Sequence, residues 1–203
     1  MSTPDVVAFD FGGVLIEWDP RHLYRKLFAG DEAGMERFLT YVCSFTWNSM
    51  QDAGRSFDDA VAELTRRFPQ HADLIAAYHE RWEEMQPYVF EDTVAILKEL
   101  KANGVPVYGI TNFPAEKFAI TRKRHSFLDL LDGIVVSGEV RLMKPDPGIF
   151  LHFLERFDLE ASRCVFIDDS KVNTEAAARL GFHGVHHHSA DDLRQRLVEW
   201  GLL

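Results

Sequence analysis

The segment Val6-Val7-Ala8-Phe9-Asp10-Phe11-Gly12-Gly13-Val14 decides how the rest of the chain is interpreted. The run Val6–Phe11 is too short and too continuously apolar for a surface helix, so we expect a strand that is buried on both faces. Two glycines follow the carboxylate, and they allow a tight turn that brings bare backbone amides close to an anion. The segment therefore predicts a buried strand that delivers Asp10 to an anion-binding loop.

Further short apolar runs follow, and amphipathic helices alternate with them. The helix Glu91–Ala102 stops at Asn103-Gly104, and the helix Pro147–Phe157 begins after Asp146, a typical N-cap. Such alternation is typical of a parallel sheet covered on both faces, so we predict a three-layer α/β/α, Rossmann-like core. The other expected strands are Val105–Ile110, Gly133–Ser137, Cys164–Asp168 and Gly184–His187.

The alternation is interrupted once, because only helical patterns occur between Ile16 and about Tyr88. We predict an all-helical cap over residues 17–86, inserted into an α/β core made of residues 1–16 and 87–203. A helical module poised over strand ends is a natural lid. The expected cap helices are Pro20–Phe28, Ala33–Tyr41, Phe57–Arg67 and Ala72–Met85, and residues 45–54 are expected to form a loop.

Composition restricts the possible partners. The chain has 203 residues, of which 22 are Lys or Arg and 32 are Asp or Glu, so its formal charge is −10. Such a surface repels duplex DNA, and no apolar stretch is long enough to cross a membrane, so neither is expected as a partner. Cys43 and Cys164 lie far apart in apolar runs, as expected for buried, reduced thiols. We expect a cytoplasmic protein, either a monomer or a weak dimer.

Polar side chains collect where the predicted strands end, which is where open α/β sheets bind ligands. Acids placed this close together cannot all stay ionised without a cation between them, and a set of oxygen ligands favours Mg²⁺. The threonine, the asparagine and the lysine of this set are hydrogen-bond donors suited to phosphate oxygens. The combination predicts that a phosphoryl group is transferred from a small phosphorylated molecule to an aspartate, so that an aspartyl-phosphate forms. The set comprises Asp10, Thr111, Asn112, Lys144, Asp168 and Asp169.

These residues resemble the four motifs of the haloacid dehalogenase-like hydrolases, most of which are phosphatases. The resemblance covers essentially the whole chain, and the helical insertion stands at the first cap position of that family. The four similar segments are Phe9–Leu15, Thr111-Asn112, Ser137–Val140 through Lys144-Pro145-Asp146, and Asp168–Ser170 through Asn173.

The resemblance implies a role for each matching residue. Asp10 would be the nucleophile and, with the Gly12 carbonyl, would share Mg²⁺ with Asp168 and Asp169. Thr111, Asn112 and Lys144 would hold the phosphate, beside the amides of Gly12 and Gly13, and Asn173 would orient the site.

Gly12 departs from the family pattern, since most of its phosphatases carry there an Asp that protonates the leaving alcohol. Three explanations stay open: a leaving group that needs no acid, an acid supplied by the cap, with Asp52 as first candidate, or a poor enzyme. Bacterial sugar-1-phosphate phosphatases of this family show a similar Asp-x-Gly motif and an acid-x-Gly element like Asp52-Ala53-Gly54. That resemblance favours the first explanation and a sugar 1-phosphate.

The sequence alone does not decide the role of three cap residues or exclude two alternatives to a phosphatase. Trp47, Asn48 and Asp52 could line a polyol pocket, or Trp47 could pack into the cap. Dehalogenation would use the same aspartate, but Asp168 and Asp169 would be uncompensated charges in such a metal-free site. A phosphometabolite-binding protein without turnover is the other alternative.

Overall fold

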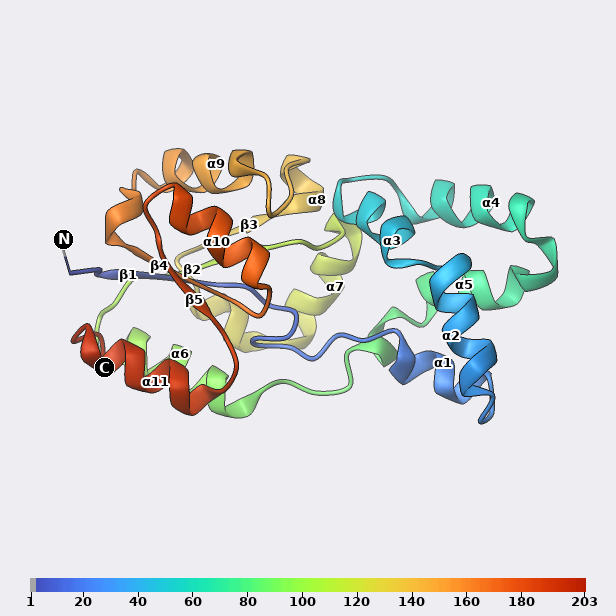
Figure 1. The fold of residues 1–203 in the computed structure, drawn as a ribbon, viewed down its shortest axis with the longest axis horizontal. Helices are drawn as coiled ribbons and strands as arrows, with labels where there is room; N and C mark the ends of the chain where they lie inside the picture. Colours follow the sequence, from blue (N-terminus) through green and yellow to red (C-terminus); the bar gives the residue numbers. More distant parts are fainter. Residues whose placement is uncertain (1–2) are drawn as a thin grey trace.

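A computed structural model describes residues 3–203. In this part of the chain, five parallel strands form one sheet in the order β3-β2-β1-β4-β5 (Figure 1). The central strand β1 pairs in register with both neighbours, so Val7 lies beside Val107 on one side and Val165 on the other. The strands are β1 (Val6–Phe9), β2 (Val107–Thr111), β3 (Gly133–Val136), β4 (Cys164–Asp168) and β5 (His183–His186).

Helices cover both faces of the sheet, as the alternation of side chains along β1 requires. Val7 and Phe9 pack in the same apolar cluster as α6 (Glu91–Ala102) and α11 (Ala190–Glu199). Val6 and Ala8 point the other way, into a second cluster built by the helices above the sheet in Figure 1. This arrangement confirms the predicted three-layer α/β/α core. The helices on that second face are α9 (Pro147–Phe157) and α10 (Lys171–Arg179).

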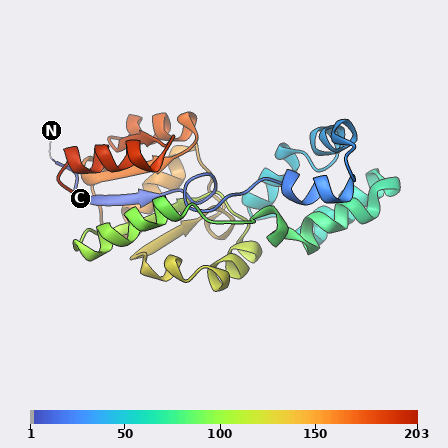
Figure 2. The ribbon, with the colours of Figure 1, turned by 90° about the horizontal axis from the view of Figure 1, so that it is seen from below.

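The inserted cap is entirely helical and lies at the end of the sheet opposite the termini. Figure 2 shows the two lobes joined by extended chain segments, and Ile16 forms an antiparallel bridge with Val89 where these segments meet. The helical insertion is confirmed, and the exact boundaries at 16/17 and 86/87 stay predictions. The cap elements are α1 (Arg21–Leu27), α2 (Glu32–Tyr41), α3 (Phe45–Asp52), α4 (Phe57–Arg67), η1 (Pro69–His71), α5 (Ala72–Glu80) and η2 (Trp82–Met85).

Some local predictions were wrong. Residues 45–54 do not form a loop, because α3 occupies Phe45–Asp52 and the Ser44 hydroxyl caps its first turn at the amide of Trp47. The expected helix Ala72–Met85 ends at Glu80, and a short 3₁₀ turn completes it. The remaining elements are η3 (Ser126–Leu130), η4 (Ala161–Arg163), α7 (Ala115–Arg124) and α8 (Ser137–Val140).

Two expectations from composition can be compared with the fold. Cys43 and Cys164 are buried and free, as predicted for small apolar residues. Among residues 3–203, no helix is both long enough and apolar enough to span a bilayer.

Candidate active site

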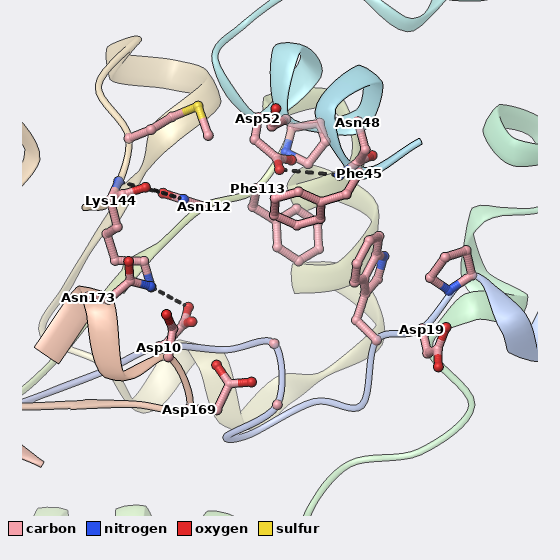
Figure 3. Close-up of a pocket in the computed structure, with 18 of the residues that line it drawn as sticks. Asp10, Asp19, Phe45, Asn48, Asp52, Asn112, Phe113, Lys144, Asp169 and Asn173 are labelled. Atoms are coloured by element: carbon pink, nitrogen blue, oxygen red, sulfur yellow. Dashed lines mark hydrogen bonds and ion pairs between the residues drawn. The ribbon is translucent and has the colours of Figure 1, made fainter. Parts of the chain in front are cut away.

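A cavity of about 900 Å³ separates the carboxyl ends of the strands from the cap (Figure 3). Its floor comes from the core: the loop after β1, the segments after β2 and β3, and the N-terminal region of α10. Its roof and far wall come from the cap, so the cavity exists only because the two lobes face each other. The chemically informative lining residues are Asp10, Gly12, Gly13, Asn112, Lys144, Asp169 and Asn173 below, and Trp18, Asn48, Asp52, Tyr78 and Trp82 above.

Lys144 stands at the centre of the floor. Its buried ammonium lies 2.8 Å from Asp10 Oδ1 and 2.7 Å from Asp168 Oδ2, and it donates a third hydrogen bond to the Ile110 carbonyl at 3.0 Å. Burial alone would lower the pKa of Lys144, but the two carboxylates outweigh burial and raise it. Lys144 is therefore a fixed cation, and its position was predicted from the sequence.

Asp10 is held by the start of its own loop. The Phe11 amide donates a 2.7 Å hydrogen bond to Asp10 Oδ1, the same oxygen that contacts Lys144. Burial raises the pKa of Asp10, and the nearby Lys144 ammonium opposes that rise. Because both contacts use Oδ1, Oδ2 keeps its lone pairs for a metal ion or a phosphorus atom.

Three carboxylates gather here, and they fit a divalent cation. One oxygen from each of Asp10, Asp168 and Asp169 can be chosen so that all three lie within 4.8 Å of one another. Lys144 compensates one of the three negative charges, so two remain, which is the charge of Mg²⁺. An oxygen-only ligand set also favours Mg²⁺ over softer ions.

The two neighbouring aspartates differ in their surroundings. Asp168 is fully buried and accepts hydrogen bonds from the Ser170 amide at 2.8 Å and from Asn173 Nδ2 at 3.0 Å, in addition to Lys144. Asp169 is exposed to the cavity. Gly13 explains how Asp169 is accommodated, since a Cβ atom at Gly13 would overlap its carboxylate. Asn173 orients Asp168, in line with the orienting role that its motif implies.

The two residues that end β2 have separate roles. Thr111 Oγ1 is buried and has no hydrogen-bond partner within the described chain, and Thr111 is not among the lining residues of the cavity, so its expected contact with phosphate stays a prediction. Asn112 lines the cavity, and its expected contact with phosphate stays a prediction. Its Nδ2 donates to the Lys144 carbonyl and its Oδ1 accepts from the Lys144 amide, both at 2.9 Å. Asn112 therefore fixes the loop that carries Lys144.

The cap contributes a buried carboxyl to the roof. Asp52 is 7% exposed and accepts a 3.2 Å hydrogen bond from Asn48 Nδ2, and Figure 3 places this pair across the cavity from Asp10. Burial, reinforced by the charge of Asp10, raises the pKa of Asp52 to about 7, against the opposing effect of Lys144. Asn48 is 2% exposed, and its Oδ1 has no hydrogen-bond partner among residues 3–203.

Residues 4–181 match the family model of a haloacid dehalogenase-like hydrolase. The chain belongs to this family. A sesquiterpene phosphatase of Aspergillus oryzae is 31% identical over 186 residues, covering 91% of this chain and 90% of that protein. A phosphoglycolate phosphatase of Yersinia pseudotuberculosis is 26% identical over 184 residues, covering 86% and 77%. The crystal structure of a HAD family enzyme from Bacteroides thetaiotaomicron, a magnesium complex, aligns with a TM-score of 0.73 at 19% identity, covering 97% and 99%.

Family membership and the geometry of the site agree. The protein is a haloacid dehalogenase-like phosphatase whose three clustered aspartates form a site that fits Mg²⁺. A small-molecule phosphate ester is the typical substrate of such phosphatases. Neither curated relative is named for a sugar phosphate, so the predicted sugar-1-phosphate specificity is not established by these relatives.

Of the two readings of Trp47, packing within the cap agrees with the structure of this hydrolase, and sequence reasoning missed three aromatic residues that line the cavity. Trp47, considered for the substrate pocket, packs edge-on against Tyr78 with ring centroids 5.1 Å apart and does not line the cavity. Trp18, Tyr78 and Trp82 do line it, and none had been singled out. Aromatic residues at helical spacing are more often core residues, so the sequence carried no signal that separated these three from Trp47.

Proposed function

We propose that the protein hydrolyses a phosphate monoester with Asp10 as the nucleophile and Mg²⁺ as the cofactor. The observation that carries the proposal is the buried Lys144 ammonium between Asp10 and Asp168, beside a third carboxylate, at the floor of a cavity. A carboxylate held in this way is fixed in position and paired with a cation. It can attack phosphorus without first being reoriented.

The chain's own residues account for the two halves of the reaction. Asp10 attacks the phosphorus atom, the bond between phosphorus and the ester oxygen breaks, and the phosphoryl group is carried on the Asp10 carboxylate. Water then cleaves that acyl phosphate, which releases inorganic phosphate and restores Asp10. Lys144 and the unpartnered Thr111 hydroxyl stabilise charge on the phosphoryl oxygens through both steps.

The metal contributes charge and orientation. When bound by Asp10, Asp168 and Asp169, with the Gly12 carbonyl as a further predicted ligand, Mg²⁺ supplies positive charge that offsets repulsion between the carboxylates and a phosphate dianion. Hydrogen bonds from Asn173 Nδ2 and the Ser170 amide hold the Asp168 carboxylate in its orientation.

The cap side of the cavity bears on the class of alcohol. The first motif predicts a sugar 1-phosphate, and the unpartnered indole N–H groups of Trp18 and Trp82 could bind hydroxyl groups. However, much of the wall is apolar, which favours a second candidate, the phosphate of a large apolar alcohol. Similarity to a sesquiterpene phosphatase supports that candidate. The apolar lining residues include Trp18, Leu39, Cys43, Phe45, Tyr78, Trp82, Phe113 and Met143.

The same geometry disfavours both alternatives, a dehalogenase and a binding protein without turnover. Without a metal, Lys144 would compensate only one of the three carboxylate charges, so a dehalogenase site would keep two uncompensated charges in total. A binding protein without turnover would not need a nucleophilic carboxylate positioned beside a metal site. Neither rival accounts for the full set of residues.

Phosphate release from a panel of esters tests the proposal. Sugar 1-phosphates, farnesyl phosphate and 4-nitrophenyl phosphate would be compared with Mg²⁺ and with EDTA, using the wild type and Asp10→Asn. We expect Mg²⁺-dependent release that the variant loses by at least about a thousandfold. Faster turnover of farnesyl phosphate would support the apolar class, and faster turnover of a sugar 1-phosphate would support the polyol class. Full activity of Asp10→Asn would refute the proposal.

A further inference from the structure

Position 12, where most phosphatases of this family carry the acid that protonates the leaving group, is a glycine in this chain. Gly12 lines the floor of the cavity. Apart from its chain neighbours, no described heavy atom lies within 4 Å of the place where a Cβ atom would stand at Gly12. Space for a side chain is therefore present there, and the missing acid is not a consequence of crowding. An alcohol that leaves as an alkoxide would make the first step slow, so another proton source matters.

Asp52 is the carboxyl that faces the floor from the cap. It lines the same cavity as Asp10, and it is close enough for the charge of Asp10 to affect its ionisation. The charges that act most on its pKa are those of Asp10, which raises it, and of Lys144, which lowers it. Burial favours the neutral, proton-carrying form of the Asp52 carboxyl, and the hydrogen bond from Asn48 Nδ2 fixes the position of that carboxyl.

The cap holds Asp52 over the site through direct contacts with the core. Ser137 Oγ donates a 2.6 Å hydrogen bond to the Asp52 carbonyl. Two residues further on, Gly54 has a φ of +98°, and a Cβ atom there would stand 3.1 Å from the Gly138 carbonyl oxygen. This close approach needs a glycine, so the Asp52-Ala53-Gly54 turn is fitted against the core.

We propose that Asp52 protonates the leaving-group oxygen, in place of the acid that is missing at Gly12, and that Asn48 positions it. The inference rests on the proposed function, since it assigns a further residue to the same reaction. It selects the second of the three explanations considered for Gly12, an acid supplied by the cap.

The proton balance closes over one turnover. In the first step Asp10 bonds to phosphorus, the bond from phosphorus to the ester oxygen breaks, and the Asp52 proton passes to that oxygen, so that a neutral alcohol leaves. In the second step Asp52, now a carboxylate, takes a proton from water as its oxygen bonds to phosphorus and Asp10 is released. Asp52 is then protonated again, and no other reactant is required.

Two esters that differ in leaving-group acidity test the assignment. In Asp52→Asn, kcat/KM for benzyl phosphate should fall by roughly a hundredfold or more, because benzyl alcohol is a poor leaving group without a proton. For 4-nitrophenyl phosphate the fall should stay within about threefold, because nitrophenolate leaves unaided. Activity retained on the second ester also shows that the variant is folded.

Controls separate this inference from the proposed function. Asp58→Asn makes the same chemical change in a cap side chain that is 95% exposed and should leave both rates unchanged. Equal losses on both esters in Asp52→Asn, or no loss on either, would overturn the role of Asp52 while leaving Asp10 as nucleophile intact. If Asp10→Asn retained turnover, the proposed function itself would fail, whatever Asp52 did.

Discussion

Ser137 in the core and Asp52 in the cap are joined by a 2.6 Å hydrogen bond from the serine hydroxyl to the aspartate carbonyl. The same hydroxyl accepts a 2.9 Å hydrogen bond from the Phe113 amide. One buried side chain therefore connects the third core motif, the loop after β2 and the end of α3. It links the geometry of the phosphate site to the placement of the cap acid.

Removing that hydroxyl should loosen the cap. Ser137→Ala leaves a buried amide and a buried carbonyl without partners, so the free energy of unfolding should fall by about 1–3 kcal/mol. The rate with benzyl phosphate should fall more than the rate with 4-nitrophenyl phosphate, because Asp52 is no longer held. Denaturant unfolding and both assays check this. Thr46→Ala, at an exposed position on α3, the helix that carries Asp52, is the control. An unchanged ratio of the two rates would count against the link.

Lys144 should matter for stability as well as for turnover. Lys144→Met leaves Asp10 and Asp168 buried without their cation, which typically costs about 3–5 kcal/mol. Bound Mg²⁺ should restore part of that loss, since it supplies positive charge at the same carboxylates. Thermal unfolding with Mg²⁺ and with EDTA measures both effects, and Lys98→Met on the exposed face of α6 is the matched control. Equal destabilisation with and without the ion would be inconsistent with a shared metal site.

The cap acid should also appear in the pH dependence of stability. Asp52 has a pKa of about 7 in the folded protein against an ordinary value of 3.8, so between these pH values the folded state holds a proton that the unfolded state has lost. The free energy of unfolding therefore decreases as pH rises through this window. The Asp52→Asn variant lacks that contribution. Its free energy of unfolding should therefore rise relative to that of the wild type by up to the order of 4 kcal/mol from pH 4 to pH 7.

Denaturant unfolding in EDTA across that pH range measures the difference. Metal-free conditions are needed because the positive charge of Mg²⁺ near Asp10 would change the pKa of Asp52. A wild-type and variant pair whose stabilities run parallel with pH would show that Asp52 ionises normally.

The free space at Gly12 predicts a rescue. Because no heavy atom of residues 3–203 other than its chain neighbours lies within 4 Å of a Cβ atom placed at Gly12, the double variant Gly12→Asp with Asp52→Asn should place a carboxyl near the leaving group from the floor. Benzyl phosphate turnover should recover at least about tenfold over Asp52→Asn alone. Gly12→Asn in the same background provides the isosteric control, which cannot donate an acidic proton. Equal rates for the two double variants would argue that position 12 does not reach the ester oxygen.

Much of this site follows from the sequence because it lies at the ends of regular elements. The strand Cys164–Asp168 and the helices Glu91–Ala102 and Pro147–Phe157 have the predicted bounds. Buried strands and capped helices give strong local patterns, and parallel strands bring their carboxyl ends to one edge. The gathering of Asp10, Asp168 and Asp169 follows from that rule.

The parts that the sequence did not reveal depend on tertiary contacts. Helix α3 was expected to be a loop, because Phe45, Thr46 and Trp47 have modest helix propensity and the helix is stabilised by packing in the cap. The hydrogen bonds between the Asn112 side chain and the Lys144 backbone join positions 32 residues apart in the chain, so no local pattern predicts them. The burial of Asp52 likewise exists only once the cap meets the core.

Detection of a phosphoryl group on Asp10 tests the central claim most directly. The wild type would be mixed with ³²P-labelled substrate and Mg²⁺, quenched in acid within a single turnover, digested and sequenced by mass spectrometry. The account predicts label on the peptide that contains Asp10, in an acid-stable but hydroxylamine-sensitive acyl phosphate, and no label with EDTA. Turnover that proceeds with no labelled protein, or with label on another residue, would contradict it.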